Sequence, residues 1–233
     1  MKIQRFYTLL RYSGLLLAIG GLGACASTTA GANPHDMSLA EHDAAARQEE
    51  QVAEAHLAKY DPNAKKTKRS CAGVAYTADN TCQTFVVNPT EKHLEQAELH
   101  RKMAADHRAA GHALRETEDA ACPGVSHDAR TANPLPSTNI QSVTALYDRG
   151  ATLLLRAAPE LTEDALQRRL DCHLARVATL GFEDSKMSSC PLSIRGVSAE
   201  VDQTTAGLAV RIEADDPRAA AEVLRRSRGL LAH

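Results

Sequence analysis

The chain has 233 residues, of which 27 are lysine or arginine and 29 are aspartate or glutamate, so its formal net charge at pH 7 is −2. This balance does not suit a protein that binds polyanions. The chain contains no tryptophan and only 3% aromatic residues, which disfavours the stacking platforms that single-stranded nucleic acids require. A chain of this length forms one or two domains.

The first 24 residues have the layout of a secretory signal peptide. Three basic residues, Lys2, Arg5 and Arg11, precede an apolar run over residues 14–22 (GLLLAIGGL). A membrane-spanning helix needs about 20 apolar residues, and this run is shorter. We therefore expect residues 1–24 to be a signal that is removed on export.

The signal ends in Leu22-Gly23-Ala24-Cys25, which resembles the lipobox of bacterial lipoproteins. The resemblance implies that the Cys25 thiol carries diacylglycerol, that the new N-terminus is also acylated, as with palmitate, and that these chains anchor the protein in a membrane. In that family an aspartate after the cysteine favours the inner membrane. Because Ala26 stands here, the resemblance implies an outer-membrane protein that faces the periplasm. The alternative is a secretory signal without lipidation.

Two segments follow the signal. Residues 25–37 are small and polar and predict a flexible tether, and residues 38–122 predict an antiparallel helical hairpin. Ser38 and Glu41 have the spacing of a capping box, so the first helix is expected to begin at Ser38. Its composition, rich in Ala, Glu and Gln, ends near residues 60–62.

The segment between the two helices, residues 61–87, differs in composition. It holds a basic run at 65–69, and then Cys71 and Cys82 on either side of a turn signal at Asp79-Asn80. We predict a hairpin or loop closed by a Cys71–Cys82 disulfide, which stabilises a loop of this size by about 3 kcal/mol. Metal ligation by these two cysteines is the alternative.

The second helix has a start signal and a stop signal. Asn88 as the cap, Pro89 at the first helical position and Glu91 as the end of a capping box predict its start. The helical composition continues to about Ala121, and Pro123-Gly124 predicts its end.

Residues 123–138 predict a linker, and residues 139–233 predict an α+β domain. The expected elements are strands at 140–147 and 151–157, a helix that Thr162 caps and Gly181 ends, strands at 197–202 and 208–213, and a last helix that starts at Asp216-Pro217. This order predicts a two-layer ββαββα sandwich with its helices on one face of an antiparallel sheet. It resembles a ferredoxin-like arrangement with a relocated edge strand, a resemblance of topology that implies no function.

Histidines recur at multiples of seven residues on both predicted long helices, so each set occupies one stripe. They are His42 and His56 on the first helix and His93, His100 and His107 on the second. In an antiparallel pair, His56 is expected to approach His93 or His100, and His42 to approach His107 or His112.

A metal site between the helices is one interpretation of this pattern, because imidazole is a common ligand for zinc, copper and nickel. Residues seven apart rise about 10.5 Å along a helix, too far to share one ion, which favours ordinary seam histidines instead. The metal candidates on the second helix are His93, His100, Met103 and His107, of which Met103 and His107 form the one i,i+4 pair with soft-ligand character.

A second cluster lies in the predicted α+β domain. Cys172 and His173 fall in its first helix, and Met187 and Cys190 fall in the loop that follows. We expect a Cys172–Cys190 disulfide, with His173 as a hydrogen-bonded core residue. Alternatively, the four side chains form a site for Cu(I) or zinc. The Cys-x-x-Cys motif of copper-chaperone domains is missing from the corresponding loop at residues 159–162, so their site is not expected.

Besides Cys25, the mature chain has five cysteines, at 71, 82, 122, 172 and 190, and an odd number cannot all pair within one chain. With the two expected disulfides formed, Cys122 is left over. It is then either an accessible thiol that joins a second copy or a partner, or a buried and inert one.

No phosphate-binding loop, nucleophile elbow or zinc-protease motif occurs in the chain. The sequence therefore predicts a non-enzymatic envelope lipoprotein that acts as a binding or scaffolding module and needs no cofactor. Its expected partners are a membrane, through the lipid anchor, and a protein partner or second copy, but not nucleic acid. The alternative function is a periplasmic metal-binding protein for copper or zinc.

Overall fold

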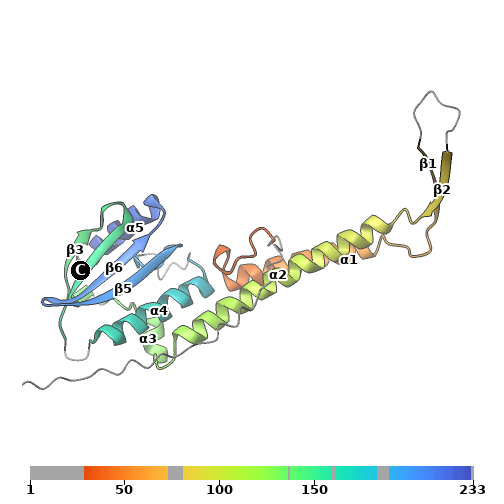
Figure 1. The fold of residues 1–233 in the computed structure, drawn as a ribbon. Helices are drawn as coiled ribbons and strands as arrows, with labels where there is room; N and C mark the ends of the chain where they lie inside the picture. Colours follow the sequence, from red (N-terminus) through yellow and green to blue (C-terminus); the bar gives the residue numbers. More distant parts are fainter. Residues whose placement is uncertain (1–28, 73–80, 136, 159–160, 183–188, 232–233) are drawn as a thin grey trace, which may run out of the picture.

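The computed structural model describes residues 29–72, 81–135, 137–158, 161–182 and 189–231. The chain is an α+β protein in which a helical rod, with a small hairpin at its far end, adjoins a four-stranded sheet with helices (Figure 1). Two of the predicted site residues, Cys25 and Met187, lie outside the described residues. No helix in the described ranges combines the length and the apolarity that crossing a membrane requires.

The rod consists of the packed pair α1 (Leu39–Leu57) and α2 (Glu91–Ala121), which confirms the predicted helical hairpin. At 1.5 Å per residue, the 31 residues of α2 span about 46 Å. Ser38 caps α1 as expected, because its hydroxyl accepts a hydrogen bond from the Glu41 N–H. The Ser38 N–H in turn donates to the Glu41 carboxylate at 2.7 Å.

The start of α2 differs from the prediction by two residues. The helix begins at Glu91 rather than Pro89, because Asn88 does not cap it. Instead the Asn88 side chain accepts from the Thr90 N–H at 2.8 Å and donates to the Asp61 carbonyl at 2.8 Å. These bonds make a turn that joins the start of α2 to the chain just after α1.

The hairpin consists of β1 (Lys66–Ala72) and β2 (Thr81–Val87), paired antiparallel at the end of the rod (Figure 1). Cys71 lies opposite Cys82 in the register, and the predicted disulfide between them is confirmed. The described side chains of both strands are exposed or half-buried. Since a two-stranded sheet alone is marginal in water, the disulfide supplies much of the stability of this hairpin.

The sheet of the C-terminal domain is antiparallel throughout, in the order β3-β4-β6-β5. The elements of the C-terminal domain are β3 (Ile140–Ala145), η3 (Tyr147–Arg149), β4 (Gly150–Arg156), α4 (Glu163–Leu180), β5 (Val197–Thr204), β6 (Gly207–Ala214) and α5 (Pro217–Gly229). Both helices start at the predicted caps, Thr162 and Asp216, whose side chains accept from the N–H groups three residues on.

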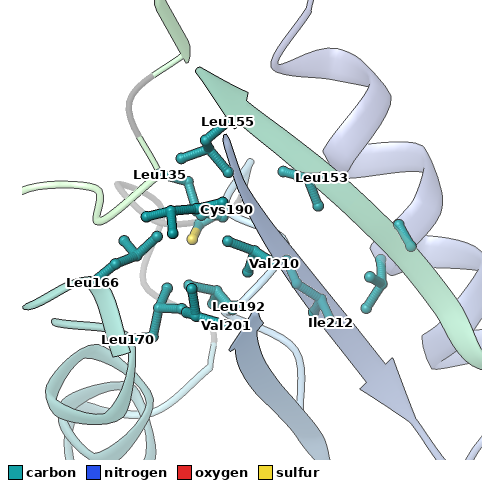
Figure 2. Close-up of a cluster of buried hydrophobic side chains, with 13 residues drawn as sticks. Leu135, Leu153, Leu155, Leu166, Leu170, Cys190, Leu192, Val201, Val210 and Ile212 are labelled. Carbon is teal, nitrogen blue, oxygen red and sulfur yellow. The ribbon is translucent and has the colours of Figure 1, made fainter. Parts of the chain in front are cut away.

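The core of the domain lies between one face of the sheet and the two helices. Alternate residues of the two central strands point into it: Ala151, Leu153, Leu155, Leu208, Val210 and Ile212 (Figure 2). Leu166 and Leu170 of α4 and Val223 of α5 belong to the same buried cluster. Both helices therefore cover one face of the sheet, as the strand alternation predicts.

The segment at 123–138, expected to be a linker, is folded against the domain. It contains α3 (His127–Thr131) and η2 (Ser137–Asn139), and Leu135 is fully buried in the core of the sheet. The Arg130 guanidinium donates to the carbonyls of Cys122 and Val125, both at 3.0 Å, and so satisfies backbone groups at the end of α2. The segment is short and rich in proline, so its sequence did not indicate that it packs against the domain.

The described part of the expected tether is also held in place. It includes η1 (Pro34–Asp36), whose His35 and Asp36 carbonyls accept hydrogen bonds from the Arg195 guanidinium. The Thr29 hydroxyl donates to the Asp106 carboxylate on α2 at 2.5 Å. From residue 29 onward, the chain before α1 is therefore docked on both the rod and the domain.

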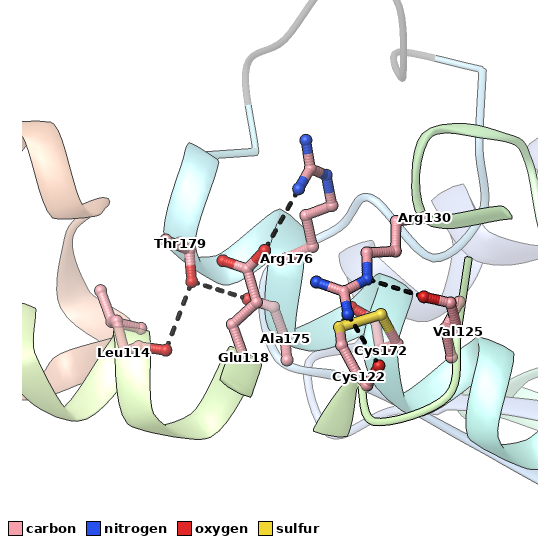
Figure 3. The surroundings of a disulfide bond; sticks show 9 residues. All are labelled: Leu114, Glu118, Cys122, Val125, Arg130, Cys172, Ala175, Arg176 and Thr179. Atoms are coloured by element: carbon pink, nitrogen blue, oxygen red, sulfur yellow. Dashed lines mark hydrogen bonds and ion pairs between the residues drawn. A yellow bond between two sulfur atoms is a disulfide. The ribbon is translucent and has the colours of Figure 1, made fainter. Parts of the chain in front are cut away.

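A disulfide between Cys122, at the end of α2, and Cys172, in α4, joins the rod to the domain (Figure 3). Two further contacts accompany it. Arg176 on α4 forms an ion pair with Glu118 on α2 at 3.2 Å, and the Thr179 hydroxyl lies 3.4 Å from the Leu114 carbonyl. We call these three α2–α4 contacts the clamp.

The clamp overturns the predicted Cys172–Cys190 disulfide and the unpaired Cys122. Successive helix residues point about 100° apart, so α4 directs Cys172 toward α2 and directs His173 toward the core. Cys190 lies in that core, 5% exposed, and is the free cysteine among the described residues (Figure 2). Cys122 has a partner within the chain, and the cysteine left unpaired is the buried Cys190. The odd number of cysteines therefore does not support a dimer linked through Cys122.

Candidate functional site: histidine rungs between the two long helices

The facing sides of α1 and α2 carry polar side chains one heptad apart, which meet as three rungs. Moving by seven residues along α1 is matched by moving seven residues back along α2, as expected for antiparallel helices. The rungs are His42–His107, Glu49–His100 and His56–His93. Alanines separate them: Ala46, Ala53, Ala97 and Ala104, each at most 2% exposed.

This ladder confirms the contacts that the heptad spacing predicts. Of the two partners expected for each histidine of α1, His56 contacts both His93 and His100, and His42 contacts His107. His112 lies outside the ladder and forms an exposed ion pair with Glu116 at 3.2 Å.

The rung nearest the hairpin, which we call the outer rung, is half-buried. The Nδ1 atoms of His56 and His93 lie 3.2 Å apart, so one of them donates its proton to the other. The ring of His100 stacks on His56 with centroids 5.7 Å apart and an interplanar angle of 13°. The Nδ1 of His100 is 2.5 Å from a carboxylate oxygen of Glu49.

The rung nearest the domain, the inner rung, has the same spacing but a drier setting. The Nδ1 atoms of His42 and His107 lie 3.2 Å apart, and the two residues are 0% and 4% exposed. The Nε2 of His42 lies 3.4 Å from the Pro34 carbonyl. Both polar ends of this buried imidazole therefore have partners, as buried polar groups require.

The outer rung favours a neutral imidazole at His56. Desolvation lowers the pKa of His56, and the positive charges that His93 and His100 can carry lower it further. A neutral imidazole offers one unprotonated nitrogen, which can accept a hydrogen bond or bind a metal ion.

The predicted metal ligands are only partly brought together. His93 and His100 both adjoin His56, whereas His107 lies at the inner rung and Met103 is half-buried beside the stripe. Across the described ranges, no group of three or more histidine, cysteine, aspartate or glutamate side chains is arranged to hold a metal ion.

The predicted cysteine–histidine cluster reduces to one buried pair. Cys172 forms the disulfide with Cys122, and the Cys190 sulfur lies 3.5 Å from Nε2 of His173. Burial raises the pKa of the Cys190 thiol, and burial with the nearby charge of Arg176 lowers the pKa of His173 to about 4. Both groups are therefore neutral at pH 7, unlike the thiolate that a cysteine nucleophile needs.

A groove of about 490 Å³ lies where α2, α4 and the start of β5 meet. Its lining is mainly apolar, with Leu174, Phe182 and Ile194 among the walls and with Asp171 and Arg195 as charged members. The Arg195 guanidinium lies 5.1 Å from the centre of the Phe182 ring. The volume is within the range of small-molecule sites.

No sequence pattern indicated this groove, because its lining comes from segments far apart in the chain. No short motif relates η1, α2, α4 and the residues before β5, and only the packing of rod against domain brings them together. The Cys122–Cys172 disulfide helps to hold the rod against the domain, whereas the sequence predicted a Cys172–Cys190 disulfide and an unpaired Cys122.

The two disulfides favour an extracytoplasmic location, because such bonds form and persist in oxidising compartments. Comparison of the chain with protein-family models, with curated proteins and with solved structures finds no match.

Proposed function

We propose that the chain is a non-enzymatic binding or scaffolding module of the cell envelope, anchored through acyl groups on Cys25 to the outer membrane and facing the periplasm. The observation that carries this proposal is the clamped rod. A helix of 31 residues is fixed to a folded domain at one end and holds a disulfide-closed hairpin at the other. Such a frame holds two surfaces at a set separation, which is what a scaffold requires.

Two further observations support a role in binding rather than catalysis. The apolar groove between rod and domain has the size of a ligand site. The buried Cys190–His173 pair is held neutral, so it is not poised as a nucleophile and base. The strand order β3-β4-β6-β5 supports the ferredoxin-like arrangement with a relocated edge strand, a likeness that carries no function.

The anchor is tested by a Cys25→Ser substitution. We expect the wild-type chain to fractionate with membranes and the variant to appear in the fraction released from the envelope. A matched Cys190→Ser variant, which changes a buried thiol far from the signal, should fractionate like the wild type. Membrane retention of the Cys25→Ser chain would contradict lipid anchoring.

The binding role is tested by photocrosslinking in cells from two exposed positions. Val86 on β2 is 68% exposed and belongs to a run of exposed apolar residues, whereas Tyr147 beside β4 is 95% exposed and stands apart from it. Exposed apolar clusters mark contact sites, so we expect a discrete adduct from position 86 and none from position 147. Identical patterns at both positions would contradict a binding surface at the hairpin.

A further inference from the structure

The outer rung has the ligand spacing of a tetrahedral zinc site. Zinc–nitrogen bonds of 2.0–2.1 Å at a tetrahedral angle place two ligand nitrogens about 3.3 Å apart. The Nδ1 atoms of His56 and His93 are 3.2 Å apart. Linear two-coordinate binding with bonds of similar length needs about 4 Å, so the rung fits a tetrahedral ion better than a linear Cu(I) ion.

The surroundings of this rung supply what such an ion needs. His100 stacks on His56, and its Nδ1 lies 2.5 Å from the Glu49 carboxylate, so in the neutral tautomer that donates to Glu49 the free nitrogen is Nε2. A carboxylate that fixes a histidine in this way is the usual support of a metal-binding imidazole. The rung is half-buried, so water can reach it.

We propose that His56 and His93 form an open binding site for Zn²⁺ at the hairpin end of the rod, with His100 joining after a rotation of its side chain and water completing the tetrahedron. On binding, the imidazole that donates from Nδ1 loses this proton to solvent and takes one up at Nε2, so that both Nδ1 atoms present a lone pair to Zn²⁺ and the two neutral imidazoles release no net proton. This inference goes beyond the proposed binding role, because that role requires no metal.

The inner rung has the same nitrogen spacing but is not a zinc site. His42 is 0% exposed and His107 is 4% exposed, so no water can complete the coordination of an ion there. Placing a dication in that position without further ligands carries a large desolvation cost. Within one pair of helices, the outer rung would therefore bind metal and the inner rung would serve only to hold the helices together.

The test is equilibrium dialysis of the full-length chain, purified without a polyhistidine tag, against Zn²⁺ followed by metal analysis. We compare wild type, His93→Gln and His112→Gln. His112 lies on the same helix outside the ladder, and with Glu116 it forms an exposed pair of potential ligands that serves as a control. Circular dichroism establishes whether each variant keeps its helices. If His93→Gln loses them, His56→Gln replaces it as the binding-site variant.

We expect one Zn²⁺ per chain in wild type and in His112→Gln, and binding at least about tenfold weaker in His93→Gln. Substituted Co²⁺ should give the visible absorption of a tetrahedral ion in the same two proteins. Absence of binding in the wild type, equal binding in all three proteins, or loss of binding in His112→Gln alone would each overturn the proposal.

Discussion

At the scale of single residues, His173 makes folding sensitive to acid. It is 6% exposed, and burial together with Arg176 lowers its pKa from 6.5 to about 4. Because the pKa of His173 is lower in the folded chain than in the unfolded chain, the unfolded chain binds more protons at pH values between about 4 and 6.5. The stability from this neutral imidazole is present above pH 6.5 and falls by about 3 kcal/mol as the pH drops toward 4.

A His173→Gln variant isolates this effect, because glutamine keeps an acceptor for the Cys190 thiol but does not titrate. We expect urea unfolding to show the wild type losing about 3 kcal/mol more than the variant between pH 6.5 and pH 4. His56, whose pKa is also lowered, contributes with the same sign to both proteins. Equal pH dependence in the two proteins would contradict a buried neutral His173.

The inner rung allows a second test with single residues. A His107→Leu substitution leaves the Nδ1 of His42, which is 0% exposed, without its partner. We expect the free energy of unfolding to fall by about 1–3 kcal/mol, the cost of an unsatisfied buried polar group. The double variant His42→Leu with His107→Leu removes both polar groups and should recover most of that loss.

Chemical denaturation of the four proteins of this cycle provides the measurement. A coupling energy near zero, with the two single changes simply adding, would show that the His42–His107 hydrogen bond does not act as a unit. The Arg115–Asp43 ion pair is exposed and serves as a control contact between the same helices, for which we expect a coupling below about 1 kcal/mol.

At the scale of elements, the two disulfides have separable effects. The Cys71–Cys82 bond closes a hairpin that stands apart from both cores, whereas the Cys122–Cys172 bond closes a segment of 50 residues that links α2 to α4. Replacing the first pair with serine should open β1 and β2 locally and leave the cooperative unfolding midpoint unchanged. Replacing the second pair should cost about 4 kcal/mol of global stability.

Hydrogen exchange resolved by peptide distinguishes these outcomes. In the first variant, faster exchange should be confined to residues 66–72 and 81–87. In the second, it should extend through the end of α2 and into α4. A global loss of protection in the hairpin variant, or an unchanged midpoint in the clamp variant, would contradict this division.

Local signals predicted most element boundaries, since a cap acts within a few residues of the helix it begins. Ser38, Thr162 and Asp216 cap helices where the sequence indicates. The heptad spacing of histidines and alanines likewise predicted the facing partners of His42 and His56, because two helices of fixed pitch can be aligned by pattern alone.

Tertiary contacts decided what the sequence could not. Cys172 is close to Cys190 in sequence and distant from Cys122, but the packing of α2 on α4 selects the distant partner. Leu135 sits in a Pro-rich segment with no periodic neighbours, and its burial depends on the core it completes. The groove near Arg195 was not predictable for the same reason.

At the scale of the whole molecule, the clamp gives the protein its form. Without it, the rod and the sheet would be connected by residues 123–138 and by the contacts of η1 with Arg195. With it, the cysteine pair, the Arg176–Glu118 ion pair and the contact between Thr179 and Leu114 hold the base of the rod against α4 (Figure 3). The hairpin is thereby held about one helix length from the domain, and the inner rung fixes the register of the helices between them.

Non-reducing peptide mapping of the exported chain, alkylated before digestion, tests this architecture most directly. We predict one peptide pair joined through Cys122 and Cys172, another joined through Cys71 and Cys82, and a Cys190 thiol that is alkylated only after unfolding. A Cys172–Cys190 link together with a Cys122 thiol that is alkylated in the native protein would contradict the clamp and the account of the rod that depends on it.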